Sequence, residues 1–377
     1  MFRFFLKRNN DIDYLLQQGN ALYDRKKYTS AIKKYARILQ LDSKNFPSIV
    51  NTGMAYFELQ KYDRSIPFFN RAIEMDNTNP WWYNYLSQSL QKCGDFQGSL
   101  DNAWQAVLLS ENDNAHHINM AYTIYEISGE TGREKTDSFL KKWYEKYPEN
   151  PVAKQCYKSF YYDENYTNSD PKYVEELFDV FAEYFDDVLH NLQYDSPRII
   201  AEYLYEYFNT KNKKNISILD LGCGSGLCGK YIKNKLTKAQ LYGVDISAKM
   251  LEKAAEKNVY DNLLQSDITN CFTKEKLVFD AVVASDVLTY FGELETLFKK
   301  VDSLLKKNSA FIFTVTENKT NDFDFFLMPS SRFVHSEKYV DSIIKKYNFK
   351  VKKSDKKILR KEGDKDIEGI IYQVIKQ

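Results

Sequence analysis

Residues 218–231 read ILDLGCGSGLCGKY, an apolar run that passes into a loop with glycines at alternate positions. An acidic residue opens this loop in the pattern Asp220-x-Gly222-x-Gly224-x-Gly226. The same stretch also contains Gly224-x-Gly226-x-x-Gly229, which matches the dinucleotide-binding fingerprint. The two patterns imply different ligands, so the surrounding sequence has to decide between them.

From residue 216 onward, short apolar runs alternate with amphipathic segments. The runs are ISILDLG, QLYGVDI, NLLQSDI, FDAVVASDV and SAFIFTVTE. Runs of this kind separated by helical segments predict a parallel, doubly wound α/β sheet of Rossmann-like type. In such a sheet, ligands bind beyond the carboxyl ends of the strands.

Four carboxylates fall at or near the ends of successive runs, and we expect them to ring one crevice: Asp220, Asp245, Asp267 and Asp286. A diphosphate is repelled by such a crevice, because it requires helix N-terminal N–H groups and positive charge. A cationic ligand is attracted. The glycine triplet by itself leaves a dehydrogenase as the alternative, whereas the ordered set of acidic residues and glycines favours a cation.

The first half of the chain repeats with a period of 34 residues, since Gly19, Gly53 and Ser87 stand one period apart. This is the period of the tetratricopeptide repeat, a helix pair in which a small residue allows a close helix crossing. Three clear copies and a degenerate capping copy over residues 115–147 predict an all-α solenoid.

Residues 12–150 therefore resemble the tetratricopeptide family. The resemblance implies a concave surface that binds a peptide or another protein. The aromatic residues that open the third copy either belong to that surface or pack between repeats; they are Trp81, Trp82, Tyr83 and Tyr85.

Residues 216–317 resemble the class I S-adenosylmethionine-dependent methyltransferases, with ILDLGCGSG, YGVDIS and LLQSDI as successive motifs. The whole chain is similar to a bacterial family of methyltransferases fused to tetratricopeptide repeats. That wider similarity rests on YVEELFDVFAEYFDDVLHNLQYDSP, ASDVLTYFGEL, SRFVHSEKYV and ILRKEGDKDIEGIIYQV.

S-adenosylmethionine carries a sulfonium and an ammonium but no phosphate, which suits the acidic crevice. Asp245 is placed to accept both ribose hydroxyls, and Asp267 to accept the adenine amino group. Ile246 and Met250 can face the adenine ring. The full set expected at the cofactor is Asp220, Gly222, Gly224, Gly226, Asp245, Ile246, Met250, Asp267 and Ile268.

Methyl transfer mainly requires alignment of the acceptor with the methyl group and removal of a proton. We expect Asp286, Tyr290 and His335 to be catalytic and Arg332 to bind substrate. The alternatives are that Asp286 holds the cofactor or a helix N-terminus, and that Arg332 forms a surface ion pair. His335 has the most suitable intrinsic pKa, although it equally suits a local bond at the start of the helix at Ser336. The run ASDVLTYF lacks the loops of amino-nitrogen, adenine and cytosine methylases, which disfavours those acceptors.

Two further segments bear on the site. Phe181, Tyr184 and Phe185 form either a lid over the cofactor or part of the core. The closing stretch KKILRKEGDKDIEGIIYQV predicts a hairpin on the sheet edge, with its lysines and Arg360 in solvent.

Composition excludes several classes. Lys plus Arg (53) balance Asp plus Glu (52), which disfavours nucleic acid and anionic membranes as partners. The five cysteines are scattered, which indicates reduced thiols. His116 and His117 are adjacent and make a poor metal pair, so no metal is expected. MFRFFLKRNN is not an export signal, and no apolar run approaches a membrane span, so we expect a cytoplasmic protein.

The sequence thus predicts a repeat domain over residues 12–160, a linker over 161–171 and a class I methyltransferase domain over 172–377. The favoured hypothesis is an enzyme that methylates a protein or a small molecule, with the repeats recruiting a protein partner. The alternative is an adaptor whose methyltransferase-like domain binds the cofactor without turnover.

Overall fold

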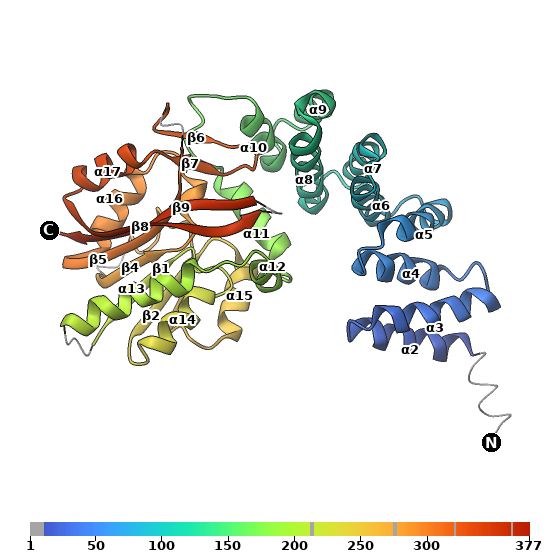
Figure 1. Cartoon of the computed structure of the whole chain (residues 1–377), viewed down its shortest axis with the longest axis horizontal. Coiled ribbons are helices and arrows are strands. Elements are labelled where there is room, and N and C mark those ends of the chain that lie inside the picture. The colour runs from blue at the N-terminus through green and yellow to red at the C-terminus, as the bar shows by residue number, and fades with distance from the viewer. Residues whose placement is uncertain (1–10, 212–214, 274–276, 320–321, 363–364) are drawn as a thin grey trace, which may run out of the picture. The chain divides into compact units, whose positions relative to one another are not determined.

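The computed structural model describes residues 11–211, 215–273, 277–319, 322–362 and 365–377 (Figure 1). The opening stretch MFRFFLKRNN, on which the absence of an export signal was argued, lies outside the described residues. The chain divides into two compact units, residues 1–148 and residues 149–377, and each is described by itself.

The first unit is all-helical and confirms the predicted repeat architecture. Its helices are α2 (Ile12–Asp24), α3 (Tyr28–Leu41), α4 (Phe46–Glu58), α5 (Tyr62–Met75), α6 (Pro80–Lys92), α7 (Phe96–Leu109), α8 (Asn114–Thr131), the 3₁₀ turn η1 (Arg133–Lys135) and α9 (Asp137–Lys146). The small residues permit close helix crossing, as expected. A Cβ added at Gly19 would lie 2.4 Å from the Tyr35 ring, and one at Gly53 would lie 3.1 Å from the Phe69 ring.

The segment predicted as a capping copy departs from the regular repeat. Helix α8 is 18 residues long and ends at Thr131, where Gly132 caps it with φ 83°; η1 separates it from α9. Its histidine His117 accepts a hydrogen bond from the Trp143 indole at 2.9 Å, which ties α8 to α9. A longer helix and an aromatic contact here replace the small-residue crossing of the earlier pairs.

The second unit is built on a seven-stranded sheet in the order β3-β2-β1-β4-β5-β9-β8. Its strands are β1 (Ser217–Leu221), β2 (Gln240–Asp245), β3 (Asn262–Gln265), β4 (Phe279–Ala284), β5 (Leu305–Thr316), β8 (Phe349–Glu362) and β9 (Lys365–Lys376). Strands β1 to β5 pair in parallel, which confirms the predicted doubly wound sheet. The closing hairpin also forms as predicted, with β9 antiparallel to β5 and β8 at the edge.

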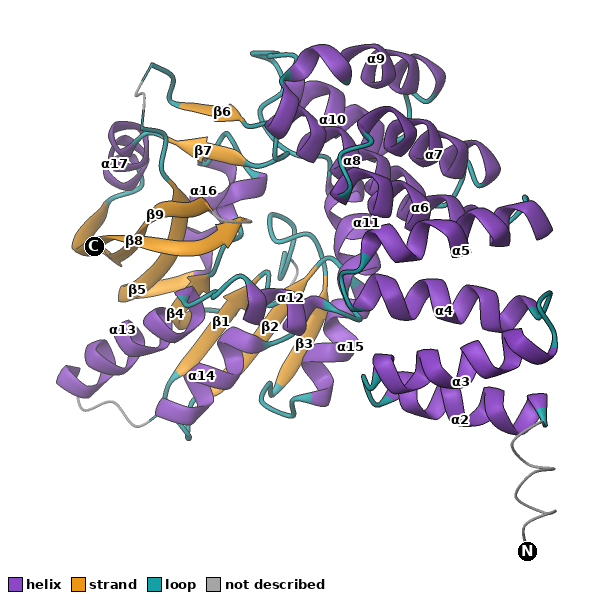
Figure 2. Cartoon of the chain, turned by 45° about the vertical axis from the view of Figure 1, so that its right-hand side comes forward, coloured by secondary structure: helices purple, strands orange, loops and turns teal. Residues whose placement is uncertain are grey.

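Helices cover both faces of this sheet (Figure 2). The helices of the unit are α10 (Pro151–Phe160), α11 (Pro171–Phe181), α12 (Phe185–Asn191), α13 (Ser196–Lys211), α14 (Leu227–Lys235), α15 (Ala248–Glu256), the turn η2 (Leu288–Tyr290), α16 (Glu295–Leu304) and α17 (Glu337–Lys346). Alternate strand residues bury against α13 and α14 on one face and against α16 and α17 on the other. Burial on both faces explains why the strands are continuous apolar runs.

The unit boundary differs from the expected one. The chain divides after Pro148, so α10 belongs to the second unit. Within that unit, the Gln155 amide donates to the Ser331 carbonyl at 3.2 Å and to the Ser169 hydroxyl at 3.0 Å. These contacts are between residues far apart in sequence, and the helical periodicity of α10 carries no information about them.

The segment 161–171, expected to be a linker, is held by the second unit. The Ser169 amide donates to the Tyr290 carbonyl at 3.0 Å, and the Gly292 amide donates to the Thr167 carbonyl at 2.8 Å. The backbone of the segment pairs with the loop that follows β4, and the side chains of Tyr166 and Ser169 pair with Gln155 of α10. The polar residues of this segment therefore reflect hydrogen bonding to the second unit and not a solvent-exposed linker.

Candidate functional site

The loop between β1 and α14 is built on left-handed glycines. Gly222, Gly224 and Gly226 have φ values of 65°, 52° and 88°. A Cβ at Gly222 would lie 2.5 Å from Val287, and one at Gly226 would lie 3.2 Å from the Ala254 backbone. A Cβ at Gly224 would meet only the edge of Phe185, at 3.6 Å. The first and third glycines therefore let the loop pack, whereas the second leaves its Cβ side almost open.

Asp220 is buried in β1 directly before this loop, 1% exposed. The Tyr260 hydroxyl donates to its Oδ2 at 2.7 Å, while its Oδ1 has no hydrogen-bond partner among the described residues. Burial raises the pKa of this carboxyl to about 7; the Tyr260 bond opposes the rise, and the neighbouring Asp245 adds to it. A buried acceptor without a donor is costly unless a ligand supplies one.

Asp245, the last residue of β2, braces the glycine loop. Its Oδ2 accepts from the Gly224 amide at 2.8 Å, and its Oδ1 accepts from the Ser247 amide at 3.0 Å. Burial raises the pKa of Asp245, and these backbone bonds oppose the rise. Each carboxylate oxygen keeps a second lone pair, so the side chain can still accept from a ligand hydroxyl.

The remaining residues expected at the cofactor are placed less uniformly. Ile246 is half-buried beside Asp245, but Met250 is fully buried, 0% exposed. The Asp267 Oδ1 accepts from the Thr269 amide at 2.7 Å, and Ile268 belongs to the sheet core. The sequence does not distinguish Met250 from a surface methionine, because the burial comes from the packing of α15.

The residues at β1 and β2 fit S-adenosylmethionine. The free oxygen of Asp220 matches an ammonium donor, and the open side of Gly224 admits a ligand close to the backbone. Two backbone amides hold Asp245 in place for hydroxyl donors. These are the requirements of the methionine end and of the ribose, respectively.

Helices α11 and α12 are tied to the loops that follow β1 and β2. The Ser247 hydroxyl donates to Asp179 at 2.5 Å, and the Lys257 ammonium bonds Asp186 at 2.7 Å. Ser225 in the glycine loop also donates to Asp186. The sequence suggested aromatic residues for a lid, but these acidic side chains make the polar attachments.

The aromatic residues of the same helices divide in their placement. Phe185 is the side chain nearest to the Cβ direction of Gly224, whereas Tyr184 is 67% exposed. Phe178 lies edge-on to both Phe185 and Tyr290, at centroid distances of 5.7 and 5.6 Å. Phe181 is half-buried. An aromatic row thus leads from the glycine loop to the end of β4.

At the end of β4 lie three of the residues that the sequence predicts to contact the methyl acceptor. Asp286 follows the strand with φ 60°, and its amide donates to the Thr314 hydroxyl at 2.8 Å. Burial raises the pKa of the Tyr290 hydroxyl. The positive charge of Arg332 lowers this pKa, and the negative charge of Asp286 raises it. Asp286, Tyr290 and Arg332 are therefore electrostatic neighbours.

Arg360 also belongs to this group, which corrects its expected exposure. Its side chain is 3% exposed, and Nη1 lies 2.9 and 3.0 Å from the two oxygens of Asp286. A run of lysines on an edge strand indicates a solvated face. Successive side chains of a strand point to opposite faces of the sheet, however, and Arg360 points to the buried face. Burial of a guanidinium requires a partner carboxylate, and Asp286 supplies it.

His335 lies apart from the other residues that were predicted to contact the methyl acceptor. It lies on the short hairpin of β6 (Phe325–Leu327) and β7 (Phe333–His335), fully buried. Its Nε2 bonds the Phe291 carbonyl at 2.7 Å, and burial lowers its pKa to about 4. These features correspond to the alternative in which His335 bonds locally, and they leave it neutral at physiological pH.

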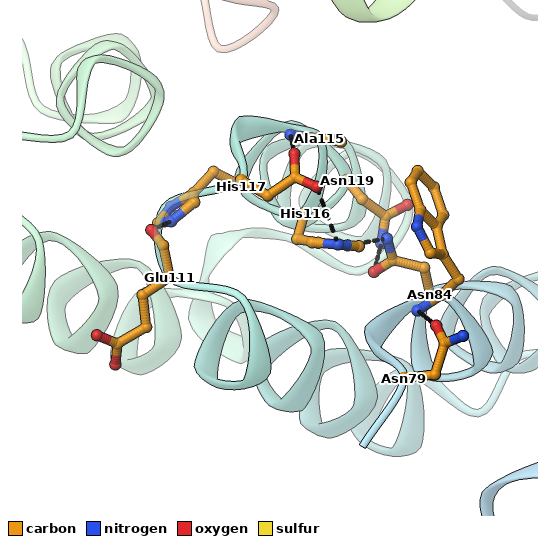
Figure 3. Close-up of polar contacts among 9 residues, drawn as sticks. Asn79, Asn84, Glu111, Ala115, His116, His117 and Asn119 are labelled. Carbon is orange, nitrogen blue, oxygen red and sulfur yellow. Dashed lines mark hydrogen bonds and ion pairs between the residues drawn. The ribbon is translucent and has the colours of Figure 1, made fainter. Parts of the chain in front are cut away.

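The adjacent histidines of the first unit are structural (Figure 3). His116 Nδ1 lies 2.6 Å from the Asn84 amide nitrogen, and His117 Nε2 lies 2.9 Å from the Glu111 carbonyl. Figure 3 shows the two rings pointing to different partners, and burial lowers the pKa of each. Among the described residues, no His, Cys, Asp or Glu group of three or more is arranged to hold a metal.

The described parts of the chain contain no helix that is both long and apolar enough to cross a membrane.

Comparison with known proteins identifies two matching families. Residues 219–311 match the family model of a methyltransferase domain, and residues 47–79 match that of a tetratricopeptide repeat. The ubiquinone biosynthesis O-methyltransferase of Pelagibacter ubique is 29% identical over 161 residues, 40% of this chain and 65% of that protein. A malonyl-[acyl-carrier protein] O-methyltransferase of Priestia megaterium is 27% identical over 147 residues, 38% of this chain and 49% of that protein. The chain thus spans about half to two thirds of the length of these relatives.

Solved structures also resemble the chain. An S-adenosylmethionine-dependent methyltransferase from Clostridium acetobutylicum is 19% identical, with a TM-score of 0.40, and the match covers 53% of this chain and 99% of that one. The plantazolicin methyltransferase BpumL, solved with SAH, is 17% identical, with a TM-score of 0.39. The match covers 63% of this chain and 100% of that one.

Proposed function

We propose that this chain, which carries a methyltransferase domain and a tetratricopeptide repeat, moves a methyl group from S-adenosylmethionine to an acceptor bound beside the end of β4. The observation that carries the proposal is the pairing of an unsatisfied buried oxygen on Asp220 with a braced glycine loop that is open at Gly224. A diphosphate offers no donor for that oxygen, so a nicotinamide cofactor fits the loop poorly.

The residues of the loop bind and orient the cofactor. Asp220 receives the ammonium of the methionine end, and Asp245 receives the ribose hydroxyls while it holds Gly224 in position. Asp267 and Ile246 border the adenine. The cofactor supplies an electrophilic methyl group on its sulfonium, so the chain needs no covalent nucleophile.

The group at the end of β4 faces the acceptor. Asp286 takes the acceptor proton on a carboxylate oxygen when the acceptor carries one, and Arg360 holds that carboxylate in its geometry. Tyr290 and Arg332 orient the acceptor through a hydroxyl and a guanidinium. His335 supports the β6–β7 hairpin from the interior instead of moving a proton.

The repeats recruit a protein partner in this proposal. Trp81 on α6 and Tyr122 on α8 are each 46% exposed, although large aromatic side chains are usually buried in such helices. Exposed aromatic residues of this kind are enriched where proteins bind one another. The acceptor is then either the recruited protein or a small molecule.

Calorimetry with S-adenosylhomocysteine tests the cofactor site. We expect binding to the full chain and a loss of at least tenfold in affinity for Asp245→Asn, because one loop bond is lost. Glu252→Gln, an exposed carboxyl on the neighbouring helix α15, serves as the matched control and should bind normally. No binding to the wild-type chain would refute the cofactor assignment.

Transfer is tested separately with tritiated S-adenosylmethionine and a fractionated lysate. Label should appear in one fraction, and Asp286→Asn should lose transfer while retaining affinity for S-adenosylhomocysteine. If the wild-type chain binds the cofactor but label never leaves it, the adaptor alternative holds. Trp81→Ala should lower labelling of a protein acceptor and leave labelling of a small-molecule acceptor unchanged.

A further inference from the structure

The connection between α12 and α13 carries a tyrosine to which the proposed mechanism assigns no role. The Tyr194 hydroxyl lies 2.7 Å from the Ser285 hydroxyl, and Ser285 directly precedes Asp286 in the chain. Desolvation raises the pKa of the Tyr194 phenol well above its ordinary value, so the phenol keeps its proton. A desolvated phenol requires a hydrogen-bond partner, and Ser285 supplies it.

The end of α12 fixes the position of Tyr194. Gln193 follows the helix in the left-handed conformation, with φ 51°. Its amide donates to the His190 carbonyl at 3.1 Å, and the Tyr194 amide donates to the Leu189 carbonyl at 3.2 Å. These two bonds are the pairing of a Schellman cap, which reverses the chain direction at a helix end. The backbone of Tyr194 is therefore held by the helix itself.

The same connection is bonded to the opposite side of the acceptor group. The Leu192 carbonyl accepts from the Lys361 amide at 2.9 Å, and Lys361 directly follows Arg360. Arg360 in turn donates to both oxygens of Asp286. The connection thus bonds the neighbour of each member of this buried ion pair: Lys361 beside Arg360, and Ser285 beside Asp286.

Asp286 has a backbone conformation that its surroundings must maintain. Its φ of 60° is uncommon for a residue other than glycine, and such a conformation persists where several contacts fix it. Its amide donates to the Thr314 hydroxyl, and its carboxylate accepts from Arg360. The bond between Ser285 and Tyr194 restrains the residue that comes directly before it.

Tyr194 also lies near the cofactor loop. Helix α12, at whose end it stands, is attached to that loop through Asp186, which bonds Ser225 and the Lys257 ammonium. Cys228, in the first turn of α14, is an electrostatic neighbour of the phenol, as are Asp286 and Arg360. The phenol is therefore within electrostatic reach of the first turn after the glycine loop and of the acceptor group.

We propose that Tyr194 is a positioning residue of the acceptor site. Through Ser285, its hydroxyl holds the turn at Asp286, so that the carboxylate points in the direction that removal of the acceptor proton requires. The inference rests on the proposed function, in which Asp286 takes that proton. It gives the connection between α12 and α13 a role in the rate of transfer and not in the binding of the cofactor.

A purely structural role for Tyr194 makes different predictions. If Ser285 only satisfies the phenol, loss of the hydroxyl weakens the fold by an amount that does not depend on Asp286, and the rate of transfer is unchanged. If Tyr194 positions Asp286, the two residues are coupled, and the rate falls without a change in binding.

A double-mutant cycle tests the coupling without any turnover. Tyr194→Phe should raise the opening constant of the second unit roughly fivefold, measured by amide hydrogen exchange of β1 and β4 peptides in urea. In an Asp286→Asn background the same substitution should have an effect at least threefold smaller, because the network is already broken. An equal effect of Tyr194→Phe in the two backgrounds overturns the proposal.

Tyr207→Phe is the matched control for this cycle. Tyr207 is a buried tyrosine of α13, and its hydroxyl donates to the Asn308 carbonyl at 2.5 Å. Asn308 lies near the beginning of β5, whereas the acceptor group lies at the carboxyl end of the neighbouring strand β4. Tyr207→Phe should therefore have the same effect in the wild-type and Asp286→Asn backgrounds.

A rate measurement separates positioning from binding. The probes are tritiated S-adenosylmethionine and rising amounts of the lysate fraction that the wild-type chain labels. Tyr194→Phe should lower the maximal rate roughly tenfold, while the amount of fraction at half-maximal rate and the affinity for S-adenosylhomocysteine stay within twofold. Tyr207→Phe should retain the wild-type rate. An unchanged maximal rate for Tyr194→Phe, or a loss of its affinity for S-adenosylhomocysteine, refutes the positioning role.

Failure of the proposed function gives a different result. If the wild-type chain binds S-adenosylhomocysteine but labels no fraction, the assignment of methyl transfer fails. The double-mutant cycle then decides by itself whether Tyr194 holds Asp286 in place, because it requires neither cofactor nor acceptor.

Discussion

Replacing Asp220 with asparagine should make the protein less sensitive to alkaline pH while impairing the cofactor site. Asparagine keeps an oxygen that can accept from Tyr260 but never ionises. The wild-type carboxyl has a folded-state pKa of about 7, raised from 3.8 by burial. The folded state therefore holds its proton more tightly than the unfolded state does.

The sign is the reverse of the usual case for a carboxyl. Because the folded pKa is raised, stability contributed by the protonated form is lost as pH rises from about 4 to about 7. A shift from 3.8 to about 7 corresponds to a total loss of about 4 kcal/mol, of which about 2.5 kcal/mol falls between pH 5 and pH 8. Asp220→Asn should lack this loss.

The difference between wild type and variant is the quantity to measure, because other titrating groups cancel in it. In Asp220→Asn the new amide N–H₂ has no acceptor, which costs about 1–3 kcal/mol at every pH and does not alter the slope. Relative to the wild type, the variant should therefore gain about 2.5 kcal/mol between pH 5 and pH 8.

The assay must follow the second unit. All four tryptophans, at positions 81, 82, 104 and 143, lie in the first unit, so tryptophan fluorescence reports the wrong part of the chain. Amide hydrogen exchange of peptides from β1 and β4, in a urea series at pH 5 and pH 8, gives the free energy of opening for the second unit. Parallel changes in the two proteins would refute the burial argument.

The same pKa governs ligand binding. An ammonium donor requires the ionised form of Asp220, so the affinity of the wild-type chain for S-adenosylhomocysteine should rise about thirtyfold between pH 5.5 and pH 8 and then level off. Asp220→Asn should bind weakly across this range. An affinity independent of pH would show that Asp220 does not receive the ammonium.

Gly222→Ala should destabilise the second unit by about 2–3 kcal/mol in urea unfolding, because its Cβ would clash with Val287, while Gly224→Ala should cost about 1 kcal/mol yet abolish calorimetric binding of S-adenosylhomocysteine. Equal stability losses would contradict the distinction. Asp179→Ala should speed hydrogen exchange in α11 by releasing Ser247, and unchanged exchange would dissociate that bond from the order of the helix. Arg360→Met should destabilise the second unit by about 3 kcal/mol by leaving Asp286 unpaired, and an added Asp286→Asn should recover most of that loss.

Sequence periodicity predicted the elements whose burial follows from local pattern. The 34-residue spacing of Gly19 and Gly53 predicted the helix pairs, because each glycine lies against an aromatic ring of the partner helix. The apolar runs predicted the parallel strands, since both faces of the sheet are covered. The position of Asp220 was predictable for the same reason, because the apolar run that forms β1 ends beside it.

The residues that were missed depend on contacts between distant parts of the chain. Arg360 is 74 positions from Asp286, and nothing near it in the sequence marks which lysine or arginine of the edge strand turns inward. Asp179 and Asp186 lie among other acidic residues on α11 and α12, so their bonds to the β1 and β2 loops have no local signature. His335 is chemically suited to proton transfer, but its burial depends on how β7 packs.

These contacts change the electrostatic account of the site. Four ionised carboxylates in one crevice would attract a cationic cofactor through a broad negative field. In the structure, however, Asp220 is close to half-protonated at neutral pH, and the charge of Asp286 is compensated by Arg360. Attraction over distance is therefore weaker than the count of carboxylates implies. In the proposed site, recognition therefore depends on hydrogen bonds formed at contact: the cofactor ammonium is proposed to donate to the free oxygen of Asp220 and to favour the ionised form of that carboxyl.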